Sequence, residues 1–195
     1  MLYYILCYTF MKITKQRPDR ICDGLTSNIS ENKEISNEFR FTKYHQLIKA
    51  SEMVGRASLF LKTINTFDGS DVRISKRANI PYNRLRGFQK GKVGPVDNKD
   101  YIGGNYISSI NLSTNIPGLF PTIEILDFNY FIDIANIWGV DYNDALDNSK
   151  IRSSTGLGVD WFTPIGPLSF SFSQPLTKKS TDKTESFRFQ LGTTF

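Results

Sequence analysis

Residues 123–138 read IEILDFNYFIDIANIW, and the side chains of this run alternate in character with a period of two. Its even positions are mostly apolar or aromatic, from Leu126 to Trp138, whereas its odd positions include Asp127 and Asp133. Because side chains at i and i+2 lie on one face of a β-strand, the pattern predicts a long strand with an oily face and a polar face. Soluble strands average about five or six residues, so the length favours a membrane-spanning barrel strand over a strand of a soluble sandwich.

The composition of the whole chain agrees with aromatic β-strands. Its 195 residues suffice for one domain with a sizeable core, and they include 15 Phe and nine Tyr against two Trp. A run of about 18 apolar residues, the signature of a transmembrane helix, does not occur. Any membrane span is therefore expected to be a β-strand.

Charge and reactive residues argue against several classes of function. The 24 Lys and Arg residues exceed the 19 Asp and Glu residues, but they are spread along the chain rather than gathered into the basic stripe of a nucleic-acid-binding protein. Cys7 and Cys22 form no metal-binding motif, and His45 is the only histidine. We therefore expect no nucleic-acid partner, no metal, no cofactor and no enzymatic activity.

The beginning of the chain gives no clear pattern. Residues 1–10 are apolar, but they lack the preceding positive charge and the small-residue cleavage site of a signal peptide, so we do not predict one. Residues 19–34 are polar and rich in Ser and Asn, which predicts a loop. Residues 1–33 are accordingly left unplaced, as a ragged start, and one β-domain is expected to span residues 34–195.

From Ile35 onward, the alternation predicts about seven strands. Residues 35–47 and 53–62 are expected to form a hairpin, for which a helix over residues 43–57 is the weaker alternative. The other predicted strands fall within residues 103–116, 123–138, 151–161, 168–176 and 187–195. Short turns at Pro117 and Pro164 alternate with long polar loops, as in outer-membrane barrels. The predicted fold is all-β: an antiparallel transmembrane β-barrel.

Residues 68–101 are the longest segment without alternation. Irregular loops of this length are uncommon in compact domains unless they have a function. The sequence LRGF at residues 85–88 lies near its centre, and Gly87 between Arg86 and Phe88 would allow a sharp turn that directs both side chains. Taken alone, LRGF fits an exposed turn equally well.

Five motifs in a fixed order resemble one known family. They are LRGF (85–88), GGNY (103–106), FIDIANIWG (131–139), RSSTGLGVDWFTPIGPLSFSFSQPL (152–176) and ESFRFQLGTTF (185–195). Together they resemble the carboxy-terminal barrel of the BamA family of outer-membrane protein assembly factors. The resemblance implies a partial barrel, with about seven of the family's sixteen strands, and a long loop, residues 68–101, that folds back into the lumen.

The resemblance also assigns roles to particular residues. It implies that Arg86, Gly87 and Phe88 form the motif of the lumenal loop and that Asp133 is the partner of Arg86 on the barrel wall. A second carboxylate of the family falls at Ser113 here, which predicts a thinner anchoring network. The last strand would carry the carboxy-terminal insertion signal, formed by four apolar residues: Phe187, Phe189, Leu191 and Phe195.

The functional implications follow from the same resemblance. The chain is expected in the bacterial outer membrane, as part of a factor that inserts unfolded β-barrel client proteins into the lipid bilayer together with assembly-complex lipoproteins. Client strands would pair at a seam between the first and last strands. The alternatives are a translocation-assembly factor or a two-partner secretion transporter of the same superfamily, a passive pore, and an inactive fragment of a longer protein.

Overall fold

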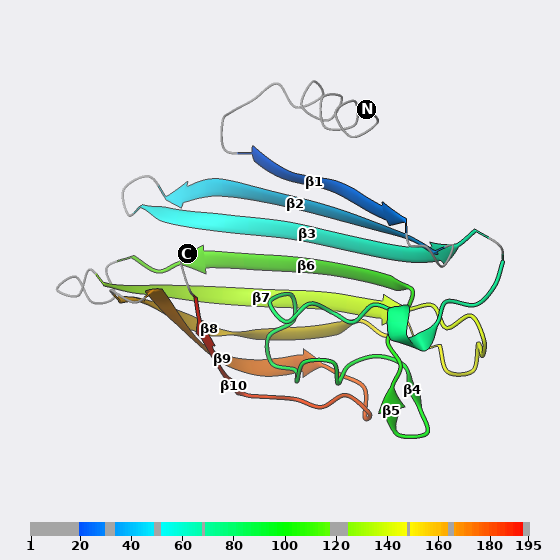
Figure 1. Ribbon diagram of the computed structural model, residues 1–195. Coiled ribbons are helices and arrows are strands. Elements are labelled where there is room, and N and C mark those ends of the chain that lie inside the picture. The colour runs from blue at the N-terminus through cyan, green and yellow to red at the C-terminus, as the bar shows by residue number, and fades with distance from the viewer. Residues whose placement is uncertain are drawn as a thin grey trace.

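The computed structural model describes residues 20–29, 34–48, 52–67, 69–117, 125–147, 149–163 and 166–192. These residues form one eight-stranded sheet and a separate two-stranded hairpin (Figure 1). The strands of the large sheet are β1 (Arg20–Ile29), β2 (Glu34–Ile48), β3 (Met53–Thr66), β6 (Tyr106–Asn115), β7 (Leu126–Trp138), β8 (Arg152–Thr163), β9 (Gly166–Thr177) and β10 (Phe187–Leu191). No helix of the described residues has the length and the apolar character to cross a membrane.

The large sheet is an antiparallel meander. Its strand order is β1-β2-β3-β6-β7-β8-β9-β10, so each strand pairs with its neighbours along the chain, and β1 and β10 are the two edges. β7 has 13 residues and β2 has 15. At about 3.3 Å per residue, strands of this length reach roughly 40 Å, enough to cross a bilayer while tilted.

The strands agree with the sequence prediction from residue 34 onward and differ before it. β2 and β3 form the expected hairpin rather than a helix over residues 43–57, and seven strands of the large sheet lie in residues 34–191. The prediction of a loop over residues 19–34 is wrong, because β1 occupies Arg20–Ile29 and pairs with β2. Its register shifts between Ile21 and Gly24, which interrupts the period of two that the sequence reading relied on.

Three of the four connections at one end of the sheet are long, and the connections at the other end are mostly short. Residues 67–105, 139–151 and 178–186 join β3 to β6, β7 to β8 and β9 to β10. At the opposite end, only residues 164–165 separate β8 from β9, and residues 49–52 separate β2 from β3. This asymmetry is typical of outer-membrane barrels.

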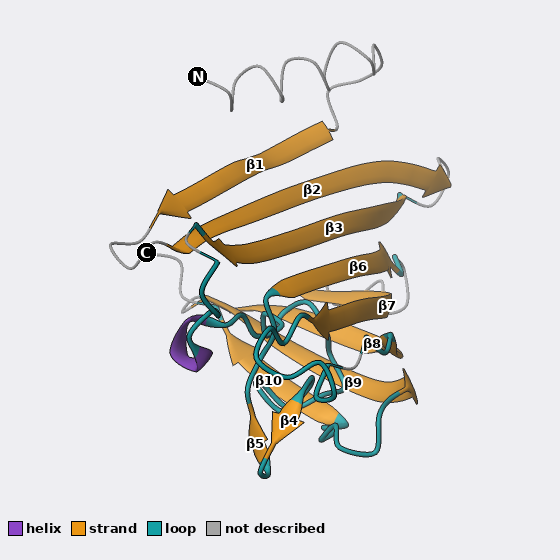
Figure 2. Ribbon diagram, turned by 90° about the vertical axis from the view of Figure 1, so that its right-hand side faces the viewer, coloured by secondary structure: helices purple, strands orange, loops and turns teal. Residues whose placement is uncertain are grey.

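The long connection of residues 67–105 lies on the concave side of the curved sheet (Figure 2). It contains a 3-10 turn, η2 (Ile74–Lys76), and a small hairpin of β4 (Val96–Asp97) and β5 (Asp100–Tyr101). Asn98 and Lys99 join the two strands with φ angles of 46° and 75°. Positive φ at both central residues is the requirement of a type I′ turn, so the segment expected to be irregular has ordered structure.

The two faces of the sheet differ as the alternation predicted. We call the face covered by the long connection the inner face and the opposite one the outer face. The outer face exposes large apolar side chains, among them Leu61, Ile110, Leu112, Tyr130, Leu157, Trp161, Phe172, Leu176, Phe187 and Phe189. Such a surface is stable where it meets lipid rather than water.

The inner face is less uniformly polar than expected. Asp133 and Arg152 are fully buried there, but the same face supplies apolar residues to a core shared with the long connection. The eight-stranded sheet, which we call the wall, contributes Phe60, Ile64, Ile107, Ala135 and Ile137 to this core. The long connection contributes Val72, Ala78, Ile80, Leu85, Phe88 and Val93. The expectation of a charged interior is therefore only partly right, since the connection packs against the wall through a small hydrophobic core.

Candidate functional site

The geometry around Arg86 forms the centre of the candidate site. β7 places Asp133 on the inner face, where it is fully buried. The Arg86 side chain donates from Nε to Oδ2 at 2.7 Å and from Nη2 to Oδ1 at 2.8 Å, and its backbone N–H donates to Oδ2 at 3.1 Å. This bidentate, charge-assisted contact fixes both the position and the orientation of the long connection, which we also call the loop, on the wall.

The neighbouring strand completes the coordination of Asp133. Asn111 on β6 is the register partner of Asp133, and its Nδ2 donates to Oδ1 at 2.9 Å. The same nitrogen donates to the backbone carbonyl of Arg84 at 2.7 Å. The carboxylate thus accepts four hydrogen bonds, which matches its roughly four lone-pair sites and offsets its burial.

The aromatic and small residues beside Arg86 leave it little freedom. Its guanidinium carbon lies 3.4 Å from the centre of the Phe131 ring. Gly87 has a φ of 89°, and a Cβ there would lie 3.1 Å from the Cβ of Ser154. Phe88 is almost fully buried in the shared core. At this one point of the loop, Arg86 binds the wall, Gly87 provides the turn and Phe88 packs into the core.

Ser113 does not bind Asp133 or Arg86 directly. The polar side chain that assists Asp133 comes from Asn111, two residues earlier on β6, whereas Ser113 lines a cavity near the short connections that Arg86 also lines. That the network is thinner than is usual in the family stays a prediction. Within this chain, further contacts centred on Arg84, Arg188, Asp182 and Asp141 also hold the loop.

Arg84 forms a second anchor that the sequence reading missed. Its Nη1 donates to Ser58 Oγ on β3 at 2.6 Å and to Asn111 Oδ1 at 3.3 Å, and its guanidinium lies 5.1 Å from the centre of the Phe60 ring. The only signal in the sequence was a second arginine two residues before Arg86. The pair Arg84 and Arg86 spreads the attachment of the loop over β3, β6 and β7.

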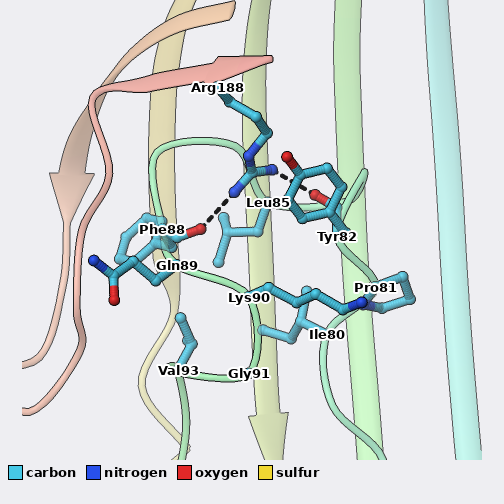
Figure 3. A pocket seen from close by; sticks show the side chains of 10 residues that line it. All are labelled: Ile80, Pro81, Tyr82, Leu85, Phe88, Gln89, Lys90, Gly91, Val93 and Arg188. Carbon is cyan, nitrogen blue, oxygen red and sulfur yellow. Dashed lines mark hydrogen bonds between the residues drawn. The ribbon is translucent and has the colours of Figure 1, made fainter. Parts of the chain in front are cut away.

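Arg188 joins the edge strand β10 to the long connection, as Figure 3 shows. Its Nη1 donates to the carbonyl of Tyr82 at 2.6 Å and its Nη2 to the carbonyl of Phe88 at 2.5 Å. The guanidinium also lies 3.9 Å from the centre of the Tyr82 ring, and Nε donates to Glu185 at 3.1 Å. The β10 edge is therefore held by the loop as well as by β9.

The other predicted residues of the last strand point the opposite way. Phe187, Phe189 and Leu191 are exposed on the outer face, where Phe189 packs 5.2 Å from the Phe170 ring of β9. Phe195, the last residue of the expected signal, lies outside the described residues.

Arg152 and Asp182 form a fully buried ion pair. Nε of Arg152, on β8, donates to Oδ2 of Asp182 at 3.0 Å, and Nη2 donates to Oδ1 at 3.3 Å. Asp182 also accepts from the backbone N–H of Lys179 at 2.7 Å and of Gly94 at 3.3 Å. One carboxylate thereby links the wall, the β9–β10 connection and the long connection.

Backbone hydrogen bonds extend this link. The N–H of Gln89 donates to the carbonyl of Lys183 at 2.9 Å, and the N–H of Lys183 donates to the carbonyl of Lys92 at 3.0 Å. The N–H of Glu185 donates to the carbonyl of Gly87 at 3.0 Å. The segment after the LRGF motif therefore lies alongside the β9–β10 connection in strand-like pairing.

Asp141 in the β7–β8 connection holds the start of the loop. It accepts from the backbone N–H of Val72 at 2.7 Å and from Asn105 Nδ2 at 3.0 Å, and it forms an ion pair with Arg77. Burial alone would raise the pKa of Asp141, but the hydrogen bonds and the nearby Arg77 outweigh it and hold the pKa below its usual value. The ionised form is therefore the one that the fold stabilises.

Comparison with known proteins places this architecture in a family. Residues 24–195 match the Omp85 superfamily domain. The chain belongs to the Omp85 superfamily. The family match includes the part of β1 from Gly24 onward, which the sequence reading left unplaced.

Curated Omp85 relatives are similar over much of the chain. The outer membrane protein assembly factor BamA of Neisseria meningitidis serogroup B is 31% identical over 143 residues, covering 57% of this chain and 17% of that protein. The BamA of Neorickettsia risticii is 27% identical over 142 residues, covering 71% of this chain and 19% of that protein. The chain thus spans less than a fifth of the length of these relatives, and the resemblance to the BamA family is confirmed.

A solved Omp85 structure has the same fold. The crystal structure of BamA from Haemophilus ducreyi lacking POTRA domains 1–3 superposes with a TM-score of 0.76 at 28% identity, covering 88% of this chain and 37% of that chain. The predicted fold class, an antiparallel transmembrane β-barrel present in part, is confirmed, and so is the bacterial outer membrane as its location.

Proposed function

We propose that this chain is the loop-bearing wall of an outer-membrane protein assembly factor and takes part in inserting unfolded β-barrel client proteins. The observation that carries the proposal is the anchoring of the LRGF loop to Asp133 beside an edge strand that the same loop holds through Arg188. The names of the relatives, outer membrane protein assembly factors, support the same reading.

The edge of β10 is the part of the wall suited to a client. Among the described residues, β10 pairs with β9 over five residues and presents its other side as a sheet edge. An extended client segment can pair with the backbone groups of such an edge without a matching sequence. Arg188 and the outward Phe187 and Phe189 would then hold the edge in place between loop and lipid.

This mechanism uses binding and strand pairing rather than a catalytic group. The bilayer is the first partner, since the outer face of the wall is apolar, and unfolded β-barrel proteins are the substrates. The lipoproteins of an assembly complex would be partners of the parent protein. In this proposal the free energy for insertion comes from the client's own burial and hydrogen bonding, so no cofactor takes part.

A passive pore fits the structure less well. In water-filled barrels the inner face is polar, whereas here the wall and the loop share a buried apolar core that includes Phe60, Leu85 and Ile137. This core takes up space on the inner face that a channel would leave to water. Conductance of the intact parent barrel in a planar bilayer distinguishes the two functions.

A chimera tests the proposed function directly. Residues 34–195 replace the matching barrel segment of the Neisseria meningitidis BamA, and insertion of a β-barrel client into liposomes is followed by its heat-modifiable mobility on gels. We expect the chimera to insert the client and the Arg86→Ala chimera to lose most of that activity. A folded chimera that leaves the client uninserted would contradict the proposal. The 195-residue chain assayed alone in the same liposomes tests the alternative of an inactive fragment.

A further inference from the structure

A groove of about 450 Å³ opens on the outer face of the sheet, away from the loop and its anchors. It lies where β2, β3, β6 and β7 approach the short connections. Its walls are formed by apolar side chains of neighbouring strands, which include Leu47, Leu112, Tyr130 and Ile132. The groove is thus a depression within the surface that faces lipid.

Small residues on β3 create this depression. Gly55 is the register partner of His45 on β2 and of Thr114 on β6, and Ala57 is likewise paired with Lys43 and Leu112. A side chain on Gly55 would begin 3.2 Å from the side chain of Leu47. Two successive outward positions without a long side chain leave a trough between taller neighbours, in which an extended hydrocarbon chain can make van der Waals contacts.

The charge along the groove has one sign. Lys43 lines it from β2 beside His45, whose imidazole can donate a hydrogen bond, and its described lining residues include no Asp or Glu. A lysine on the lipid-facing side of a barrel costs about 2–4 kcal/mol at the midplane and less near the interface, so its ammonium extends toward the head groups. An anion at that level would be held by a charge-assisted hydrogen bond.

We propose that this groove binds a phospholipid with an anionic head group. One acyl chain lies in the trough over Gly55 and Ala57, and the phosphate accepts hydrogen bonds from Lys43 and His45. The apolar walls, the volume, which falls within the usual range of about 300–1,000 Å³ for ligand sites, and the positive rim all match this occupant. The groove is continuous with the surface that meets the bilayer, so the lipid reaches it without crossing the protein.

The test compares lipid retention by native mass spectrometry of the full 195-residue chain in a neutral detergent. Phosphatidylglycerol and phosphatidylcholine with the same acyl chains are offered together. We expect one retained phospholipid, with phosphatidylglycerol favoured by about tenfold, because both lipids carry the phosphate but the choline cation of phosphatidylcholine is repelled by Lys43. Lys43→Gln removes the preference but keeps the lipid, and Gly55→Leu, which fills the trough, loses both lipids.

Ser108→Leu is the matched control, because it adds the same side chain to the outer face on β6 outside the groove. It is expected to retain lipid as the unchanged chain does. Heat-modifiable mobility verifies folding of each variant, and Ala57→Leu fills the same trough if Gly55→Leu does not fold. The proposal is overturned if a folded trough-filling variant retains as much lipid as Ser108→Leu does. It is also overturned if the unchanged chain retains the two phospholipids equally.

Discussion

The substitution Asp133→Ala probes the attachment of the LRGF loop. It removes the acceptor of three hydrogen bonds from Arg86 and of one from Asn111. The loop then keeps its apolar contacts and the stacking of Arg86 on Phe131, but the Arg86 guanidinium loses the one carboxylate that pairs with it among the described residues. We expect the loop to leave the wall more often without unfolding of the sheet.

The size of the effect follows from the burial of the pair. Asp133 is fully buried, whereas the Arg86 side chain keeps 21% of its surface exposed, so part of its charge remains solvated after the substitution. Breaking a buried ion pair costs about 3–5 kcal/mol, and this exposure places the expected loss near the lower end, about 3 kcal/mol. At 1.4 kcal/mol for each factor of ten, the open population of the loop rises roughly 100-fold.

Limited proteolysis measures that population. Lys90 and Lys92 lie on the loop and are exposed, but the carbonyl of Lys92 is paired with Lys183 in the closed state. Trypsin therefore cuts efficiently only after the loop opens, and the rate follows the open population when closing is fast. The full chain in detergent micelles is digested, and the fragments ending at residues 90 and 92 are quantified over time.

Asp127→Ala is the matched control for this experiment. Asp127 lies on the same strand and lines the cavity near the short connections that Arg86 also lines, but it makes none of the hydrogen bonds or ion pairs that hold the loop. Its removal is expected to leave the cleavage rate unchanged. Asp133→Asn keeps one oxygen acceptor, so its cleavage rate is expected to lie between the rates of the unchanged chain and of Asp133→Ala. Cleavage of Asp133→Ala at the rate of Asp127→Ala would refute the inference that the ion pair holds the loop.

Three further predictions concern other contacts. Arg188→Ala removes charge-assisted bonds to two loop carbonyls, each worth about 1.5–3 kcal/mol, and should accelerate hydrogen exchange in β10 by at least tenfold, with Arg188→Lys intermediate. Gly156→Ala places a Cβ 2.8 Å from the Phe131 ring and 2.0 Å from a backbone carbonyl oxygen of β9, so it should destabilise the sheet by about 1–3 kcal/mol in urea unfolding. The pKa of Asp141 is lower in the folded state than its unfolded value of about 3.9, so its ionised form adds stability above that value, and this stability is lost as pH falls through the folded pKa. The Val72 amide, which donates to Asp141, should therefore lose protection from hydrogen exchange only below about pH 4. Asp141→Asn should abolish this pH dependence.

The alternation of polar and apolar residues predicted which side chains share a face, because the outer face of each strand exposes apolar side chains and the inner face packs against the long connection. Asp133 was placed on the polar face of its strand from periodicity alone, and the structure buries it on the inner face. The contact between Arg86 and Asp133 was an expectation from family resemblance, and the structure brings their side chains together. Their functional role stays a prediction until the loop is tested.

The remaining contacts had no local signal. β1 was missed because Asp23 and Gly24 lie beside a register shift, so its polar and apolar residues do not alternate. Asp182 is 30 residues from Arg152, and the partners of Arg188 are mainly backbone carbonyls, which the identity of the side chains does not reveal. The burial of Ile137 on the inner face had no local signal either, because the residues that cover it belong to the long connection.

The shared core of wall and loop limits how such sequences can drift. Gly94 of the loop lies so close to Ile137 of β7 that an added Cβ would meet Ile137 Cγ2 at 2.9 Å. A bulkier residue on either side would need a compensating reduction on the other, because close-packed interiors do not absorb extra volume. Lineages of this superfamily should therefore diversify loop and wall as one unit, and paired changes between residues near 94 and near 137 should be visible where many such sequences are compared.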